Sequence, residues 1–250
     1  MKTKTTRLDA LLVERGLTQS RERARALILA GQVQVDGLVI AKAGTGVAPD
    51  ANVTLLAPEH PFVSRGGVKL EHALDAFAVD PTNTIALDIG ASTGGFTDVL
   101  LRRGAARVVA LDVGHGQLDW GLRTDPRVVV LERVNARNLT PDDLPADARV
   151  FSIITIDVSF ISLRLILPQI PPLLAPGADV IALVKPQFEA GRREVGKGGI
   201  VRDAAVQARV VEEVADAAVA LGLTRAGVCE SPITGMEGNH EYLLHVRWPG

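Results

Sequence analysis

The fold is decided by Asp88-Ile89-Gly90-Ala91-Ser92-Thr93-Gly94-Gly95-Phe96. This stretch ends the apolar β-like run Thr84–Ile89 and leads into an amphipathic segment over Gly95–Arg103. In a doubly wound α/β sheet, such a turn lies at the carboxyl end of the first strand, where ligands bind. Glycines let the backbone approach a ligand closely, and free N–H groups at the helix start donate to its polar atoms. The stretch therefore predicts a bound nucleoside.

The spacing of the turn narrows the class of ligand. It reads Asp-x-Gly-x-x-x-Gly-Gly rather than Gly-x-Gly-x-x-Gly, which disfavours the pyrophosphate of a nicotinamide cofactor. The next β-like run, Arg107–Val113, brings Asp112 roughly 20 residues on, where a carboxylate accepts bonds from ribose hydroxyls. The third run ends near an asparagine placed to contact an adenine edge. The expected cofactor-binding residues are Asp88, Gly90, Ala91, Ser92, Gly94, Gly95, Phe96, Asp112, Asn135 and Asp157.

From Phe62 onward, apolar runs alternate with amphipathic segments, which predicts a mostly parallel sheet covered by helices. Further β-like runs are Val128–Leu131, Ser152–Asp157 and Asp179–Val184. Helices are expected over Ile161–Leu174 and Ala204–Leu221. The last two runs, Arg225–Glu230 and Glu241–Trp248, predict a terminal hairpin that is antiparallel in part. The fold class is α/β, doubly wound, with a small α+β domain before it.

Residues 1–60 form that small domain, and residues 61–250 form the second. Leu8, Leu11 and Leu12 have helical spacing, and Gly16 ends the helix. A second helix is expected from Arg21 to Ala30, with Ser20 as its N-cap. The remaining expected features are a strand over Gln32–Val35, an Asp36-Gly37 hairpin turn, a closing strand over Val53–Leu56, and a linker marked by Pro58, His60 and Pro61.

Composition excludes several classes. Cys229 is the single cysteine of the 250 residues, so no intrachain disulfide forms. The five histidines show no metal-ligand spacing, and no metal is expected. No apolar run reaches the ~20 residues of a membrane span, and no apolar signal-peptide core follows Met1. We therefore expect a cytoplasmic protein with no stable membrane association.

Charge is distributed unevenly between the two parts of the chain. Residues 1–70 hold ten Lys/Arg against six Asp/Glu, whereas the remaining 180 residues hold 17 against 23. A basic segment on an acidic body favours contact with a polyanion. Arg21 and Arg25 share one helix face. The expected RNA contacts are Lys4, Arg7, Arg21, Arg23, Arg25, Arg65, Arg192, Arg193 and Lys197.

Several segments carry a family resemblance. They are Phe62–Glu71, Asp88–Phe96, Asp157–Leu163, Val184–Glu189, Lys197–Val201 and Gly235–Tyr242. These segments resemble the FtsJ-like methyltransferases and, more closely, the TlyA (hemolysin A) family of rRNA methyltransferases. The N-terminal domain resembles the RNA-binding module first known from small-subunit ribosomal protein four. The resemblance covers nearly the whole chain.

The resemblance implies that S-adenosylmethionine is the cofactor and that a ribose 2′-hydroxyl of rRNA, of a cytidine, is the methyl acceptor. It implies a catalytic tetrad of Lys69, Asp157, Lys185 and Glu241, with Lys185 as the base. In-line positioning supplies much of the rate of such a transfer, and a positioned lysine can remove the hydroxyl proton. Ser159 and Phe160 follow Asp157 and are candidates for the pocket of the methyl group or target nucleotide. Phe160 has two equal interpretations, stacking on a base and packing in the core.

Three alternatives remain at this stage. A base-directed methyltransferase or a nicotinamide enzyme uses the same fold, although the motif after Asp157 and the glycine spacing fit neither well. A non-catalytic RNA-binding or ribosome-assembly factor would keep the basic domain without needing Lys185. A membrane-active hemolysin is suggested by the family's second name.

Overall fold

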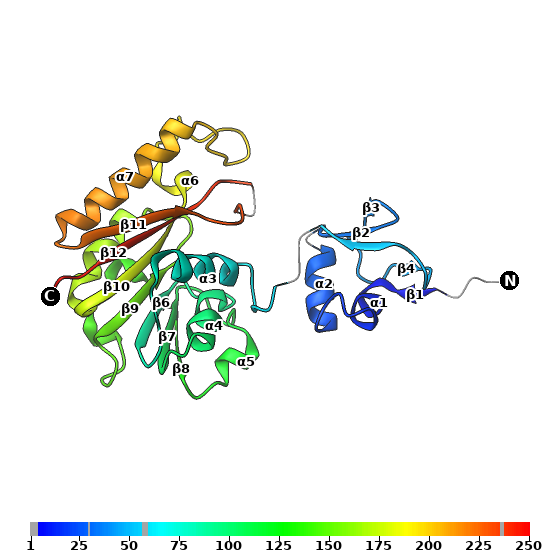
Figure 1. Ribbon diagram of the computed structural model, residues 1–250, viewed down its shortest axis with the longest axis horizontal. Helices are drawn as coiled ribbons and strands as arrows, with labels where there is room; N and C mark the ends of the chain where they lie inside the picture. Colours follow the sequence, from blue (N-terminus) through cyan, green and yellow to red (C-terminus); the bar gives the residue numbers. More distant parts are fainter. Residues whose placement is uncertain (1–4, 30, 57–59, 236–237) are drawn as a thin grey trace. The chain divides into compact units, whose positions relative to one another are not determined.

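The computed structural model describes residues 5–29, 31–56, 60–235 and 238–250 of the chain. The chain divides into two compact units, Met1–Pro61 and Phe62–Gly250 (Figure 1). Three residues with expected roles lie outside the described residues. They are Lys4, expected to contact RNA, Ala30, expected at a helix end, and Pro58, expected in a linker.

The N-terminal unit packs two helices against short strands. The helices are α1 (Leu8–Glu14) and α2 (Arg21–Leu29). Ser20 caps α2 as predicted, because its Oγ accepts a hydrogen bond of 3.2 Å from the backbone N–H of Arg23. The strands are β1 (Thr6–Arg7), β2 (Val33–Val35), β3 (Leu38–Val39), β4 (Gly46–Val47) and β5 (Val53–Leu55). The predicted hairpin is confirmed, since Val35 pairs with Leu38 across the two-residue turn.

The second unit is built on a seven-stranded sheet with the order β11-β12-β10-β9-β6-β7-β8. The strands are β6 (Ile85–Ile89), β7 (Arg107–Asp112), β8 (Val128–Glu132), β9 (Phe151–Ile156), β10 (Leu174–Val184), β11 (Thr224–Glu230) and β12 (Tyr242–Arg247). Strands β6 to β10 run parallel, whereas β12 is antiparallel to both β10 and β11. The predicted mostly parallel sheet with a terminal hairpin is therefore confirmed.

Helices cover both faces of this sheet, which makes the fold doubly wound (Figure 1). On one face, α3 (Gly66–Phe77) and α4 (Gly95–Arg102) pack against Ala86 and Val108. On the other face, α7 (Ala204–Ala220) packs against the layer that contains Leu87 and Ile89. Strand residues alternate between the two cores because successive side chains point to opposite faces. Short helices complete the unit: α5 (Trp120–Arg123), α6 (Pro186–Glu189), η1 (Ala136–Asn138) and η2 (Pro141–Asp143).

The predicted helix over Ile161–Leu174 is wrong. The segment forms three 3₁₀ turns, η3 (Leu163–Leu165), η4 (Leu167–Gln169) and η5 (Pro171–Leu173). Prolines at 168, 171 and 172 remove backbone donors and clash with the preceding turn, so a continuous α-helix cannot form. The segment still buries Leu163, Leu167 and Leu173 in the sheet core, and these side chains produced the helix-like apolar pattern.

The described residues contain neither a membrane-spanning helix nor a metal-binding group. None of their helices is both long and apolar enough to cross a bilayer. Their His, Cys, Asp and Glu side chains form no group of three that could hold a metal ion.

Candidate active site

The carboxyl edge of the sheet brings together residues that are far apart in the chain. Asp157 directly follows β9, and Lys185 directly follows β10. Glu241 directly precedes β12, which runs antiparallel to β10, and Val184 pairs with Tyr242. The pairing therefore places Lys185 and Glu241 at adjacent positions of neighbouring strands, although 56 positions of sequence separate them.

Lys185 is a buried cation held by two neighbours. Its Nζ lies 2.5 Å from Asp157 Oδ1 as an ion pair and donates a hydrogen bond of 2.9 Å to Ser159 Oγ. Its side chain is 10% exposed, so the amine faces the carboxyl edge with little water around it. The apolar strand β10 fixes the backbone beneath it. Such a lysine is positioned for proton transfer to or from a ligand at this edge.

Asp157 uses a buried carboxylate oxygen to hold the lysine. Its Oδ1 lies 2.5 Å from Lys185 Nζ, so the ammonium group is the partner of this oxygen among the described residues. Buried polar atoms in native proteins nearly always have partners. The ion pair therefore fixes the position of the Lys185 side chain at this edge.

Lys69 and Glu241 form a second, more deeply buried ion pair. Lys69 projects from the first turns of α3, and its Nζ lies 2.5 Å from Glu241 Oε2. Their side chains are 11% and 3% exposed. The four residues of the expected tetrad thus occur as two ion pairs, and both pairs lie where β10 ends and β12 begins.

The glycine turn after β6 lies directly against Asp157. The backbone N–H of Asp157 donates to Ile89 O at 2.9 Å, and Gly90 has a φ of +84°. A Cβ at Gly90 would lie 2.3 Å from the carbonyl oxygen of Asp157. Glycine is therefore required here by strand packing and backbone conformation together.

The next two glycines of the turn are also required by the protein itself. A Cβ at Gly94 would lie 2.3 Å from a methyl of Leu122, and one at Gly95 would lie 2.2 Å from Ser64 Oγ. The space beside both residues is thus filled by side chains of the chain rather than left for a ligand. Glycine was expected at these positions so that a ligand could approach the backbone closely. The observed reason is packing against neighbouring segments.

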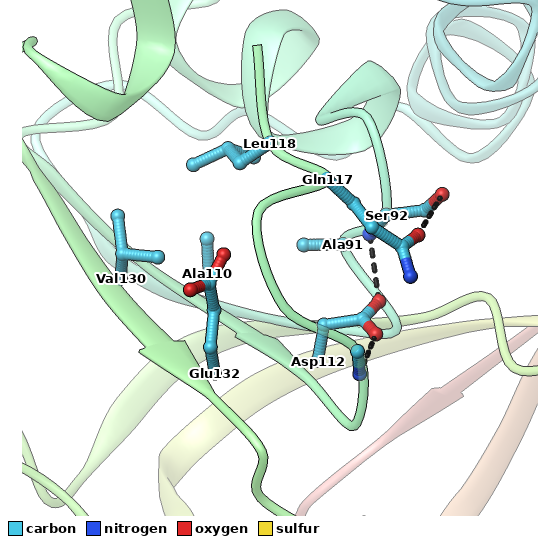
Figure 2. Close-up of a pocket in the computed structure, with 9 residues that line it drawn as sticks. Ala91, Ser92, Ala110, Asp112, Gln117, Leu118, Val130 and Glu132 are labelled. Atoms are coloured by element: carbon cyan, nitrogen blue, oxygen red, sulfur yellow. Dashed lines mark hydrogen bonds between the residues drawn. The ribbon is translucent and has the colours of Figure 1, made fainter. Parts of the chain in front are cut away.

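A small cleft opens beside the turn, between the ends of β7 and β8 (Figure 2). Ala91, Ser92 and Asp112 line it, as expected for cofactor-binding residues. Apolar side chains face the carboxylates across the cleft in Figure 2, which suits a ligand with an apolar ring and hydroxyl groups. The other lining residues, which the sequence argument did not name, are Ala110, Gly114, Gln117, Leu118, Val130 and Glu132.

Two carboxylates dominate the polarity of this cleft. Asp112 accepts a hydrogen bond from Ser92 N at 2.8 Å and from Gly114 N at 2.6 Å, one on each oxygen. Each oxygen retains a second lone pair for a ligand hydroxyl. Glu132 pairs with Asp112 in the sheet register and accepts from Gly116 N at 2.7 Å. One feature of the sequence could have identified Glu132: it is a carboxylate at the end of the apolar run of β8.

Asp88 lies beneath the turn and has no exposed surface. Thr97 Oγ1 donates to its Oδ2 at 2.7 Å, and Thr155 Oγ1 donates to its Oδ1 at 3.0 Å. Burial raises the pKa of Asp88 to about 7, because the charged form loses its hydration. Asp88 therefore joins β6, β9 and α4 under the turn instead of lining the cleft.

Two other expected cofactor residues also lie away from the cleft lining. Phe96 is 3% exposed and packs in the core between α3 and α4. Asn135 is exposed, and its side chain accepts a hydrogen bond of 3.0 Å from Arg137 N to cap η1. Its place after β8 is as expected, but it does not line the cleft.

An aromatic pair stands at the rim beside Lys185. Phe160 is 91% exposed, and its ring centroid lies 5.2 Å from that of Phe188. Core packing, one of the two sequence-based interpretations of Phe160, is therefore wrong. Glu189 is buried and fixes this rim, because it accepts from Ser162 Oγ at 2.5 Å and from Leu163 N at 2.7 Å.

In the N-terminal unit, three of the expected RNA-contacting arginines converge on one carboxylate. Asp9 is fully buried, and its Oδ2 lies 2.9, 3.0 and 3.3 Å from Arg7, Arg21 and Arg25. Hydrogen bonding, from Arg7 above all, holds the pKa of Asp9 well below its usual range. Each guanidinium remains about half exposed, so the cluster presents positive charge to solvent. Arg23 contacts His60, with Nη2 2.7 Å from the ring Nε2.

The remaining expected RNA contacts lie in the second unit. Arg65 donates to the carbonyl oxygen of Thr234 at 2.7 Å. Arg192, Arg193 and Lys197 are exposed in the loop between α6 and α7. That loop follows β10 and therefore starts from the same edge as Lys185.

A doubly wound sheet with a carboxylate-lined cleft at its first turn and buried lysine–carboxylate pairs at the same edge defines a Rossmann-like transferase. The FtsJ-like methyltransferase model matches residues 62–248, and the S4 domain model matches residues 6–53. The chain belongs to the FtsJ-like methyltransferase family and carries an N-terminal S4 domain.

Individual relatives agree with this assignment. The chain is 51% identical to the 16S/23S rRNA (cytidine-2′-O)-methyltransferase TlyA of Mycobacterium tuberculosis, over 96% of this chain and 89% of that protein. It is 42% identical to Hemolysin A of Brachyspira hyodysenteriae, over 96% and 98% of the two chains.

Solved structures give the same result for the fold. A Streptococcus thermophilus protein described as a hemolysin has a TM-score of 0.77 and 44% identity, covering 98% of this chain and 89% of that one. An S-adenosylmethionine-dependent methyltransferase from Mesorhizobium loti, 14% identical, has a TM-score of 0.51 over 70% of this chain and 96% of that one. The second likeness concerns the fold alone.

Proposed function

We propose that this methyltransferase uses S-adenosylmethionine to methylate a ribose 2′-hydroxyl in ribosomal RNA, and that the methylated nucleotide is a cytidine. The observation that carries the proposal is the buried Lys185 held between Asp157 and Ser159 beside the cofactor turn. The TlyA relative named for this reaction matches nearly the whole chain and supports the same substrate.

The cleft fits an adenosyl group by the chemistry of its lining. Asp112 and Glu132 would accept from the ribose hydroxyls, and Leu118 and Val130 would pack against the base. When bound, S-adenosylmethionine supplies an electrophilic methyl group.

The protein contributes position and a proton acceptor. The Nζ of Lys185 would take the proton of the 2′-hydroxyl as that oxygen bonds to the methyl carbon. The carbon–sulfur bond of the cofactor would break in the same step and release S-adenosylhomocysteine. Ser159 and Asp157 orient the amine, and the Lys69–Glu241 pair supports the opposite side of the same edge. Low exposure of both lysines keeps water away from the reacting oxygen.

The test is transfer of tritiated methyl from S-adenosylmethionine to purified rRNA by the full chain. Lys185→Met keeps the apolar stem of the side chain, and we expect it to lower turnover by roughly 100- to 10,000-fold. Its affinities for S-adenosylhomocysteine and for RNA should stay near those of the wild type. Wild-type turnover by Lys185→Met would remove the base assignment.

A second measurement tests the cofactor site separately from the chemistry. Asp112→Asn and Glu132→Gln each replace a carboxylate that lines the cleft, and we expect both to weaken S-adenosylhomocysteine binding in calorimetry. Asp142→Asn is a matched control, because Asp142 pairs with Arg149 away from the cleft. Equal affinities in all three variants would contradict the assignment of the cleft to the cofactor.

A further inference from the structure

The lysines and arginines of the second unit fall into two groups. Most of them form an ion pair with a carboxylate. The others have no carboxylate partner among the described residues. This second group contains the four cations of the unit already proposed as RNA contacts, which are Arg65, Arg192, Arg193 and Lys197. It also contains Arg133, Arg137 and Arg202.

The cations of the second group gather at one edge of the sheet. Arg133 and Arg137 are exposed and follow β8, and Arg202 is exposed at the end of the loop between α6 and α7. These positions belong to the carboxyl edge, where Lys185 lies. Two arginines at the opposite edge are paired: Arg149 precedes β9 and pairs with Asp142, and Arg225 lies near the start of β11 and pairs with Glu212.

The position of the unpaired cations has an electrostatic consequence. An ion pair cancels most of the field of its cation at a distance, whereas an unpaired guanidinium keeps both its field and its N–H donors. Unpaired cations gathered at one edge therefore attract a polyanion to that edge. The ligands that guanidinium groups bind best are phosphates and carboxylates, and the repeating phosphates of RNA match a row of cations.

The backbone around Arg133 is fixed at the rim of the cofactor cleft. Its φ is +61°, a left-handed conformation that is unfavourable for a residue with a Cβ. Its N–H donates to Gly114 O at 3.1 Å, and the next N–H, of Val134, donates to Asp112 O at 3.1 Å. Such strain gathers at functional sites, where the surrounding structure maintains it.

We infer that Arg133 and Arg137 form an RNA-contacting surface on the β8 side of the active site, opposite the loop that contains Arg192, Arg193 and Lys197. β8 is the last strand of the sheet, and β9 and β10, which carry Asp157 and Lys185, lie between it and β12. An RNA strand held by both surfaces crosses the carboxyl edge directly above the reactive lysine. The inference rests on the proposed RNA substrate and adds where its backbone runs.

The experiment measures filter binding of radiolabelled rRNA to the full chain without cofactor, over a range of salt concentrations. We expect Arg133→Gln/Arg137→Gln to bind roughly tenfold more weakly and to lower the slope of log K against log salt by about 1.4, which corresponds to two lost phosphate contacts on a single strand. The matched control is Arg149→Gln/Arg225→Gln, which removes the same charge from ion pairs at the other edge. Calorimetry with S-adenosylhomocysteine should give the same affinity for both double variants and the wild type.

The outcomes separate this inference from the proposed function. Equal loss of RNA affinity in both double variants would mean that only net charge matters, and an unchanged slope for Arg133→Gln/Arg137→Gln would mean that no phosphate was contacted. Either result overturns the inference while wild-type methylation of rRNA still stands. If the wild type binds rRNA with the expected salt slope but transfers no methyl group, the proposed function fails and the surface remains.

Discussion

The carbonyl oxygen of Asp157 lies so close to Gly90 that a Cβ on Gly90 would be 2.3 Å from it. This contact joins the cofactor turn to the residue that holds Lys185. The two halves of the proposed reaction, cofactor binding and proton removal, therefore depend on one packing contact between the ends of β6 and β9.

Gly90→Ala should destabilise the protein and also impair cofactor binding, since the new methyl group pushes the turn and Asp157 apart. Gly177→Ala is the matched control: its φ is +75° and a Cβ there would meet nothing within 4 Å. We expect the control to lose about 1–2 kcal/mol of unfolding free energy from backbone strain alone, and Gly90→Ala to lose at least ~1 kcal/mol more from overpacking. Urea denaturation compares the unfolding free energies of the two variants. Equal losses would show that the turn and Asp157 can move apart at no cost in free energy.

Asp88 should make stability depend on pH in an unusual direction. Its folded-state pKa is raised to about 7, so the folded protein keeps a proton that the unfolded chain releases above pH ~4. The contribution of Asp88 to the free energy of unfolding therefore falls as pH rises from about 4 to about 7, and then levels off. Asp88→Asn should remove this slope, because the amide does not titrate. Its oxygen can still accept a hydrogen bond from a threonine, so the fold should be kept. Urea unfolding of both proteins between pH 4.5 and 8 makes the comparison, and parallel curves would contradict it.

The Lys69–Glu241 pair should show different requirements for stability and for activity. Glu241→Gln leaves the Lys69 ammonium buried without its carboxylate, at an expected cost of about 3–5 kcal/mol of unfolding free energy. Lys69→Met/Glu241→Leu replaces both charges with apolar groups and should recover much of that loss. Methyl transfer should stay low in the double variant. Full activity there would assign the pair a purely structural role.

Replacing Asp9 should change RNA affinity in the direction opposite to that expected from net charge. Asp9→Asn makes the N-terminal unit more positive, yet we expect RNA binding to weaken several-fold, because Arg7, Arg21 and Arg25 lose the carboxylate that holds them together. Glu22→Gln raises the charge by the same amount on the exposed surface of α2 and should bind RNA equally or more tightly. Filter binding, measured below the melting temperature of each variant, compares their RNA affinities. Tighter binding by Asp9→Asn would show that the arginines need no organising group.

Local signals in the chain predicted most of the elements correctly. The Ser20 cap, the Asp36-Gly37 hairpin and the apolar run before Asp88 depend on neighbouring residues alone, and each is confirmed. The expected helix over Ile161–Leu174 failed because an apolar pattern was weighed above three prolines, and their missing N–H groups determined the backbone.

Site residues were harder to predict where depth in the sheet mattered. Asp88 and Asp112 both lie at or near a strand end and look equivalent in the sequence, but Asp88 pairs with Ala110, two positions before Asp112. Asp88 is therefore buried beneath Thr97, whereas Asp112 reaches the cleft. Glu132 was missed because its value comes from pairing with Asp112 in the next strand, and register is a property of the sheet.

The sequence by itself determined the class of fold and the position of the glycine turn after β6 and, through family resemblance, predicted a set of four ionisable residues. These follow from periodicity, turn chemistry and motifs, which are local. The tertiary structure decided that Lys69 meets Glu241 across 172 positions, that Lys185 meets Asp157 and Ser159, and that the glycines of the turn serve packing. These contacts depend on strand order and register, which are set by burying both faces of one sheet at once, and no local pattern encodes that.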